Sequence, residues 1–244
     1  ASDGGAIANE QGPTTVTNST FLSNNAGGNG GGGAISNEGT LVLINNTFHS
    51  NSTANGDGGA ILNNGVAHLT NNTLSDNYSS AGNGGGLANS GTLNFTNNII
   101  ANTTGGGDCI ELGGGNVASN MNNLVEDNSC APDLSGDPIL LPLADNGGPT
   151  PTMELFQNTT DSPAINAGDN AACPATDQRG VPRPNGPACD IGAYEAIYIP
   201  HAQDFFVTTW KSDNPGASGD TIITIPIVAP RILLTAYADR DTGF

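Results

Sequence analysis

The sequence predicts an all-β protein, a right-handed parallel β-helix whose chain winds through stacked coils of about 26 residues. Three observations predict this fold. The motif Gly-Gly-Ala-Ile begins at Gly4, Gly32 and Gly58 and weakens at Gly84, so its last residues lie 28, 26 and 26 positions apart. A second marker, Phe-x-x-Asn in its full form, follows each motif at the same period. The composition is rich in glycine, with 35 residues, and only 11% of the chain is charged, which is atypical of helical proteins.

Each repeat contains three strand patterns in order. The first contains the Ile of the glycine motif, the second is longer and alternates apolar residues such as Leu41 and Leu43, and the third carries the Phe marker. Alternation with a period of two indicates a strand with one buried face. Coils stacked about 4.8 Å apart place equivalent residues over one another. The two expected apolar stacks are Ile7, Ile35, Ile61 and Leu87, and Phe21, Phe48, Leu74 and Ile100.

Asparagine recurs in phase with these strands, at the turns between them. Stacked side-chain amides donate and accept in sequence, so they satisfy turn backbone groups that would otherwise be buried without a partner. We therefore expect two structural ladders of asparagine. The first contains Asn9, Asn37, Asn63 and Asn89, and the second contains Asn18, Asn45, Asn71 and Asn97.

Two sets of motifs resemble known families. Gly-Gly-Ala-Ile alternating with Phe-x-x-Asn resembles the repeat of β-helices of the polymorphic outer-membrane-protein type. The motifs Leu143-Ala-Asp-Asn-Gly-Gly-Pro-Thr-Pro-Thr, Ser162-Pro-Ala-Ile-Asn-Ala-Gly and Cys189-Asp-Ile-Gly-Ala-Tyr-Glu resemble the conserved end of the bacterial choice-of-anchor Q secreted proteins. The two resemblances together cover about residues 4–195. They imply an exported bacterial β-helix from a family with varied cell-surface anchors and generally no defined activity.

The chain divides into three regions on these patterns. Residues 1–107 are regular coils, and 108–196 are irregular coils and C-terminal loops, which we expect to wrap the C-terminal end of the β-helix. Residues 197–244 form a tail with three further strand patterns rich in β-branched and aromatic residues. Three strands alone cannot bury two faces, so the tail needs another surface to pack on.

The four cysteines form two locally spaced pairs, Cys109 with Cys130 and Cys173 with Cys189. Neither pair has the C-x-x-C spacing of zinc or redox sites, so disulfides in an oxidising compartment are expected. Each disulfide would close a loop and would stabilise the folded state by about 3 kcal/mol in the chain-entropy model. We expect a secreted protein at the cell surface whose signal peptide has been removed. No apolar run reaches the roughly 18 to 20 residues that span a bilayer, so membrane insertion is not expected.

The charge is strongly acidic, with 23 acidic against 5 basic residues and a net charge of -18. Nucleic acid is therefore not expected as a partner. Residues 1–178 contain no Lys or Arg, which removes the usual base of polysaccharide lyases, and no column of the coils is acidic. We predict no catalytic residue and no cofactor. Calcium is a weaker candidate ligand at turns of the tail that contain Asp213, Asn214, Asp220, Asp239 and Asp241.

The ends of the solenoid suggest its role. The sequence starts three residues before the first motif, which leaves no room for an N-terminal capping helix, and an open coil invites further strands. We expect an extracellular structural protein whose identical subunits associate head to tail, the tail adding strands to a neighbour's first coil. An adhesin or glycan-binding module, with Tyr78 exposed, and a polysaccharide-degrading enzyme are the alternatives. The expected interface comprises Gly4, Ile7 and Asn9 in the first coil and Phe205, Val207, Ile222, Ile223, Ile225, Ile232 and Leu234 in the tail.

Overall fold

The structure is a computed structural model that describes residues 4–27, 30–80, 82–158 and 160–197. The chain separates into two units, Ala1–Ala196 and Ile197–Phe244, and the described residues other than Ile197 belong to the first. The predicted tail strands and the calcium candidates therefore lie outside the described residues. Within that range there is no helix, and hence none long and apolar enough to cross a membrane.

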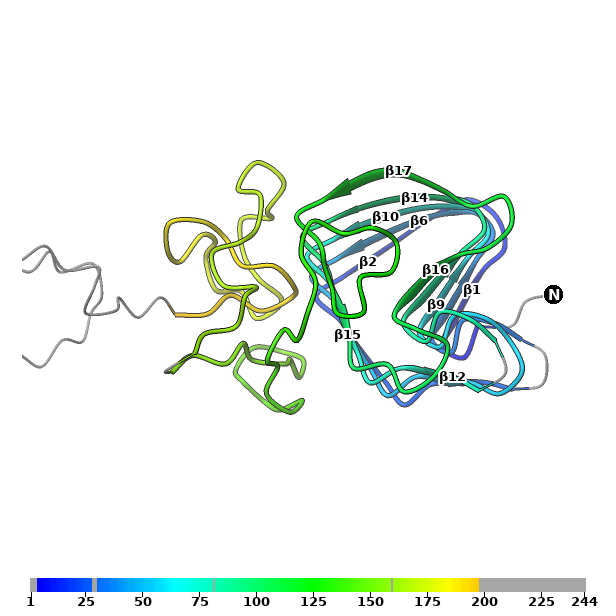
Figure 1. Cartoon of the computed structure of the whole chain (residues 1–244), viewed down its shortest axis with the longest axis horizontal. Coiled ribbons are helices and arrows are strands. Elements are labelled where there is room, and N and C mark those ends of the chain that lie inside the picture. Colours follow the sequence, from blue (N-terminus) through cyan, green and yellow to red (C-terminus); the bar gives the residue numbers. More distant parts are fainter. Residues whose placement is uncertain (1–3, 28–29, 81, 159, 198–244) are drawn as a thin grey trace, which may run out of the picture. The chain divides into compact units, whose positions relative to one another are not determined.

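The described residues form a parallel β-solenoid, as predicted, in which the chain passes each of three sheets five times (Figure 1). The coils are regular because each strand pairs in register with its equivalents in the next and the preceding coil. The exception is a one-residue shift between Leu93 and Asn94, opposite the last coil. The strands are β1 Ile7–Asn9, β2 Pro13–Thr17, β3 Thr20–Leu22 and β4 Asn25–Ala26 in coil 1; β5 Ile35–Asn37, β6 Thr40–Ile44, β7 Thr47–His49 and β8 Ser52–Thr53 in coil 2; β9 Ile61–Asn63, β10 Val66–Thr70, β11 Thr73–Ser75 and β12 Tyr78–Ser79 in coil 3; β13 Leu87–Asn89, β14 Thr92–Thr96 and β15 Ile99–Ala101 in coil 4; and β16 Cys109–Glu111, β17 Asn116–Met121 and β18 Leu124–Val125 in coil 5.

The core is the stack of inward-facing apolar side chains that the period predicts. Ile35, Ile61 and Leu87 have no exposed surface, and the Phe21 and Phe48 rings stack with centroids 4.6 Å apart. Burial of each side chain of this size contributes about 1.5 to 3 kcal/mol to the stability of the folded state. In coil 1, Ile7 and Val16 are only partly buried.

A fourth sheet was not predicted. Its strands β4, β8 and β12 have two residues each and follow the Phe marker, so no apolar alternation reveals them in the sequence. The turns before these strands contain a residue with positive φ, such as Ser50 at 55° and Asp76 at 58°.

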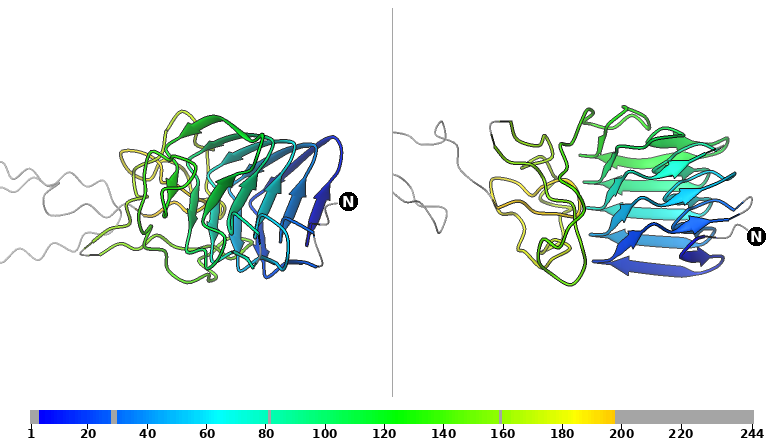
Figure 2. Two further views of the ribbon diagram at one scale, coloured as in Figure 1. Left: turned by 45° about the vertical axis from the view of Figure 1, so that its right-hand side comes forward. Right: turned by 90° about the horizontal axis from the view of Figure 1, so that it is seen from below.

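The predicted position of the C-terminal loops is wrong. We name residues 137–196 the lateral layer, because they lie along the side of the stacked coils rather than over the C-terminal end (Figure 2). The layer packs on the outer face of β15 and β18 through a second core that contains Ile99, Leu124, Leu155 and Ile191. It also reaches coil 1, where Thr20 Oγ1 donates to the carbonyl oxygen of Pro151 at 2.6 Å.

Candidate functional site

One predicted asparagine ladder forms in full. Asn9, Asn37 and Asn63 each donate from Nδ2 to Oδ1 of the next member, ending at Asn89, and all three bonds are 2.7 Å long. The four side chains are buried. The ladder runs through the turn between the first and second sheets, so it fixes the register of successive coils there.

The second predicted column is not a ladder. Asn18, Asn45, Asn71 and Asn97 all have positive φ, between 50° and 58°, which asparagine tolerates better than most residues. This backbone turns the side chains of Asn45, Asn71 and Asn97 toward the lateral layer. Asn45 Nδ2 donates to the Thr176 carbonyl at 2.8 Å, and Asn71 Nδ2 donates to the Asp190 carbonyl at 3.0 Å. Only Asn97 also donates to its column neighbour, Asn71, at 3.3 Å.

The amide ladder at this corner lies one residue later. Asn46 donates to Asn72, Asn72 to Asn98, and Asn98 to Asn123, at 3.0, 2.9 and 3.0 Å. Two consecutive asparagines recur at this corner of the coils, and this pattern could have predicted the ladder. In coils 2 to 4 the first asparagine of each pair binds the lateral layer, and the second belongs to the ladder. A third ladder, also missed, links Asn24, Asn51 and Asn77.

Threonines of the third sheet complete the docking face of the lateral layer. Thr47 Oγ1 donates to Gln178 Oε1 at 2.7 Å, and Gln178 Nε2 donates to Thr20 Oγ1 at 2.9 Å. The Ala193 N–H donates to Thr73 Oγ1 at 3.0 Å. Two segments of the layer, at Gln178 and at Ala193, thus contact three successive coils.

A buried charge cluster holds the end of the layer. Arg183 Nη1 lies 2.9 Å from Glu195 Oε2, and Arg179 Nη2 lies 2.7 Å from Asp177 Oδ2. Burial, reinforced by the neighbouring Glu195 carboxylate, raises the pKa of Asp190 to about 7. Burial also raises the pKa of Glu195 and lowers that of Arg183. The cluster is connected to the docking face, since the Asp190 carbonyl accepts from Asn71.

Both predicted disulfides are present. Cys109–Cys130 joins strand β16 to the segment after β18, and Cys173–Cys189 lies within the lateral layer beside Asn97. Disulfides are typical of an oxidising, extracellular environment.

The predicted interface residues of coil 1 lie together on β1 and just before it. Ile7 is partly buried and Asn9 is buried as the first member of its ladder. The Ile7 N–H donates to the Ala34 carbonyl of coil 2, so the N–H of Ala8 points to the opposite, outer edge. Among the described residues β1 pairs only with β5. The predicted tail residues of this interface lie outside the described range.

Strand β2, which also lies in coil 1, begins with a residue that cannot donate a backbone hydrogen bond. At the position of Pro13, the next coils have Thr40, Val66, Thr92 and Asn116, and each N–H donates to a carbonyl of the preceding coil at 2.8 to 3.0 Å. Proline has no N–H, and within sheets it is confined to edge strands, to bulges and to the first residue of a strand. Pro13 thus removes one donor that a regular preceding coil would use.

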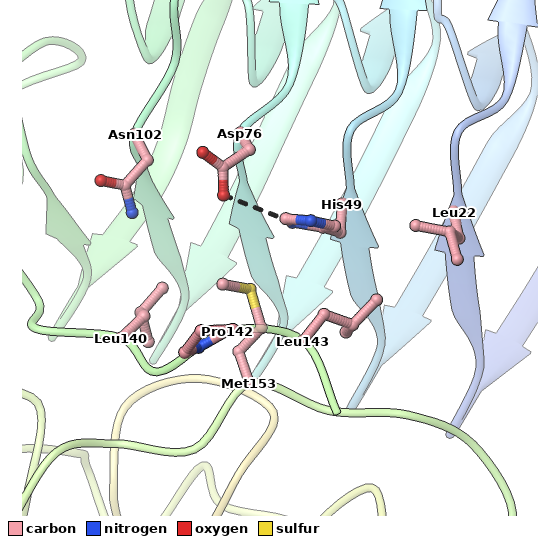
Figure 3. Close-up of a pocket in the computed structure, with 8 residues that line it drawn as sticks. All are labelled: Leu22, His49, Asp76, Asn102, Leu140, Pro142, Leu143 and Met153. Carbon is pink, nitrogen blue, oxygen red and sulfur yellow. Dashed lines mark ion pairs between the residues drawn. The ribbon is translucent and has the colours of Figure 1, made fainter. Parts of the chain in front are cut away.

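A groove separates the corner after the third sheet from the lateral layer (Figure 3). Its volume is about 490 Å³. His49 Nδ1 lies 3.3 Å from Asp76 Oδ2, and the two belong to successive coils. The lining residues are Leu22, His49, Asp76 and Asn102 from the coils and Leu140, Pro142, Leu143 and Met153 from the layer.

A second hollow of about 650 Å³ shares Asp76 and Asn102 with the groove and adds Asp108, Glu126 and Asp127. Asp108 and Asp127 each accept from the other's backbone N–H, at 2.9 and 3.0 Å. Burial raises the pKa of Asp108, whereas hydrogen bonds from Ser129 and Asp108 outweigh desolvation and lower that of Asp127. The sequence pattern did not reveal this cluster of Asp108, Glu126 and Asp127. These residues do not recur at the 26-residue period of the preceding coils.

The other predicted features are placed as follows. Tyr78 is 39% exposed on β12 and borders Gly105, outside the lining of the groove. Among the described residues, no three His, Cys, Asp or Glu side chains come together as ligands for a metal ion. Comparison with protein-family models, with curated proteins and with solved structures gives no match for this chain.

Proposed function

We propose that this chain is an extracellular structural protein, a stiff solenoid whose subunits add strands to one another at the outer edge of β1. The observation that carries the proposal is this edge. The Ala8 N–H points outward, Ile7 offers apolar surface beside it, and Pro13 restricts regular pairing along the neighbouring β2. An added strand would therefore pair along β1 by β-augmentation.

Two further features support a structural role outside the cell. The lateral layer ties successive coils together through Thr20, Thr47 and Asn71, and two disulfides constrain coil 5 and the layer. The resemblance to choice-of-anchor Q proteins points in the same direction, toward a bacterial protein exported to the cell surface. The strand patterns that the sequence predicts within residues 197–244 are the proposed donors.

Electron microscopy and light scattering of the purified full chain test the proposal. We expect head-to-tail oligomers that lengthen with protein concentration. Ala8→Pro removes the outward N–H of β1 and should abolish them, and it leaves the bonds to coil 2 intact. Thr15→Pro removes an outward N–H from β2 and is the matched control, expected to assemble normally. Single-chain particles at all concentrations would contradict assembly, and equal loss in both variants would contradict the assignment to β1.

A further inference from the structure

The groove beside the lateral layer has two unlike sides. His49, Asp76 and Asn102 lie in a row on successive coils, and the segment with Leu140 and Leu143 lies across from them (Figure 3). Leu22, which is 50% exposed, extends the apolar surface to coil 1. A ligand for this groove must satisfy polar groups along one side and apolar side chains along the other.

The polar side carries the Asp76 carboxylate between His49 and Asn102, and further carboxylates follow in the adjoining hollow. Asp76 and Asn102 also line the adjoining hollow with Glu126 and Asp127, so the carboxylates extend from coil 3 to coil 5. Coils are spaced about 4.8 Å apart, and the row from Leu22 to Asn102 therefore covers about 14 Å. A site of this length suits an extended chain rather than a compact molecule.

Every residue that lines the groove and the hollow lies within residues 1–178, which contain neither Lys nor Arg, and the one histidine in these linings, His49, is already 3.3 Å from Asp76. An acidic ligand would meet carboxylates with no Lys or Arg to pair with. A neutral glycan would find hydrogen-bond partners but would leave the negative potential uncompensated. A cationic ligand is favoured by charge complementarity.

We propose that the groove binds an extended basic peptide segment of another protein. Lys or Arg side chains have both properties that the groove requires, since their aliphatic stems pack on apolar surface while their charged ends reach carboxylates. The stems lie against Leu140 and Leu143, and the cationic ends pair with Asp76 and Glu126. This site is separate from the β1 edge, so it goes beyond the proposed assembly and does not depend on it.

Fluorescence anisotropy with a labelled octapeptide of alternating Lys and Leu tests the proposal on the full chain. We expect saturable binding that weakens at least fivefold between 50 and 300 mM NaCl, because added salt screens exposed ion pairs. The matched octapeptide of alternating Glu and Leu should not bind. Chitohexaose, a neutral oligosaccharide, serves as competitor and should leave the anisotropy unchanged.

Two pairs of variants locate the site. The double variant Asp76→Asn with Glu126→Gln should weaken binding at least fivefold, whereas Glu10→Gln, which removes an exposed charge in coil 1 outside the groove, should change it less than twofold. Leu143→Ala should weaken binding, whereas Met121→Ala, at an exposed apolar residue on β17, should not. Circular dichroism and thermal unfolding check that each variant is folded.

Three outcomes would overturn the proposal. The first is the absence of saturable binding of the Lys-Leu peptide. The second is equal affinity of the Glu10→Gln protein and the double variant, which would show attraction by the net charge alone. The third is displacement of the peptide by chitohexaose together with binding that does not depend on salt, which would assign the groove to a glycan.

Discussion

Thr47 Oγ1 donates a hydrogen bond of 2.7 Å to Gln178 Oε1, although the two residues lie 131 positions apart in the chain. Both are buried, and the amide of Gln178 continues the contact to Thr20 and Thr150. A single side chain of the lateral layer thus joins coil 1, coil 2 and a second loop of the layer. This contact is one of the polar links between the layer and the coils, beside the second apolar core.

Replacing Gln178 should therefore loosen the layer. Gln178→Ala leaves the buried Thr47 hydroxyl without its acceptor, and it removes the donor to Thr20 and Thr150. We expect a loss of about 2 to 3 kcal/mol in the free energy of unfolding, measured by denaturant titration. Gln11→Ala, at an exposed position, should cost less than about 0.5 kcal/mol. Equal effects of the two substitutions would show that the Thr47 contact adds nothing.

The Asn72 side chain should be among the most sensitive in the coils. It accepts from the backbone and side chain of Asn46 and donates to Asn98 and to the Leu43 carbonyl, all in the interior. Asn72→Ala leaves several buried groups without partners, so we expect a loss of at least about 3 kcal/mol. Asn64→Ala, at an exposed asparagine of the same coil, should cost less than about 1 kcal/mol. Thermal and denaturant unfolding compare them, and similar losses would contradict the role of the ladder.

Stability should fall as the pH rises through neutrality. Folding raises the pKa of Asp190 from 3.8 to about 7, so the folded state holds this proton more tightly than the unfolded state does. The resulting stabilisation is complete below pH 3.8 and is lost as the pH passes about 7. Between pH 5 and pH 8 we expect a decrease on the order of 2 kcal/mol.

Asp190→Asn separates this effect from other titrations. The amide does not titrate, so the variant should show a flatter profile between pH 5 and pH 8, whatever its absolute stability. Denaturant titrations at intervals of one pH unit measure both slopes. Identical slopes in the two proteins would exclude Asp190 as the source.

The regular coils could be predicted because their information repeats. Each inward residue, such as Ile35, has equivalents at a fixed period, and parallel stacking is the arrangement that superposes them all. The period could not show which of Asn45 and Asn46 belongs to the amide ladder, because both recur at the same spacing. Their roles differ through the positive φ of Asn45, which turns its side chain out toward Thr176.

The lateral layer and the groove could not be predicted for a different physical reason. Their contacts join residues that occur once and lie far apart, such as Thr47 with Gln178. No period relates the two partners, so the loops were expected at the end of the solenoid. The carboxylates of the adjoining hollow could not be predicted for a similar reason, since Glu126 and Asp127 follow the strands of the irregular coil 5.

Pro13 offers a direct test of how the N-terminal edge is protected. At the equivalent position Thr40 donates its N–H to the Gly12 carbonyl of the preceding coil at 3.0 Å, and Pro13 has no such donor. Pro13→Thr restores an outward N–H to β2 and should extend strand addition from β1 to both strands. We expect association at lower protein concentration and longer oligomers, measured by light scattering over a concentration series. Pro142→Thr, which alters a proline of the lateral layer, is the control and should associate like the unchanged protein. Unaltered association of Pro13→Thr would mean that the missing donor does not limit pairing at this edge.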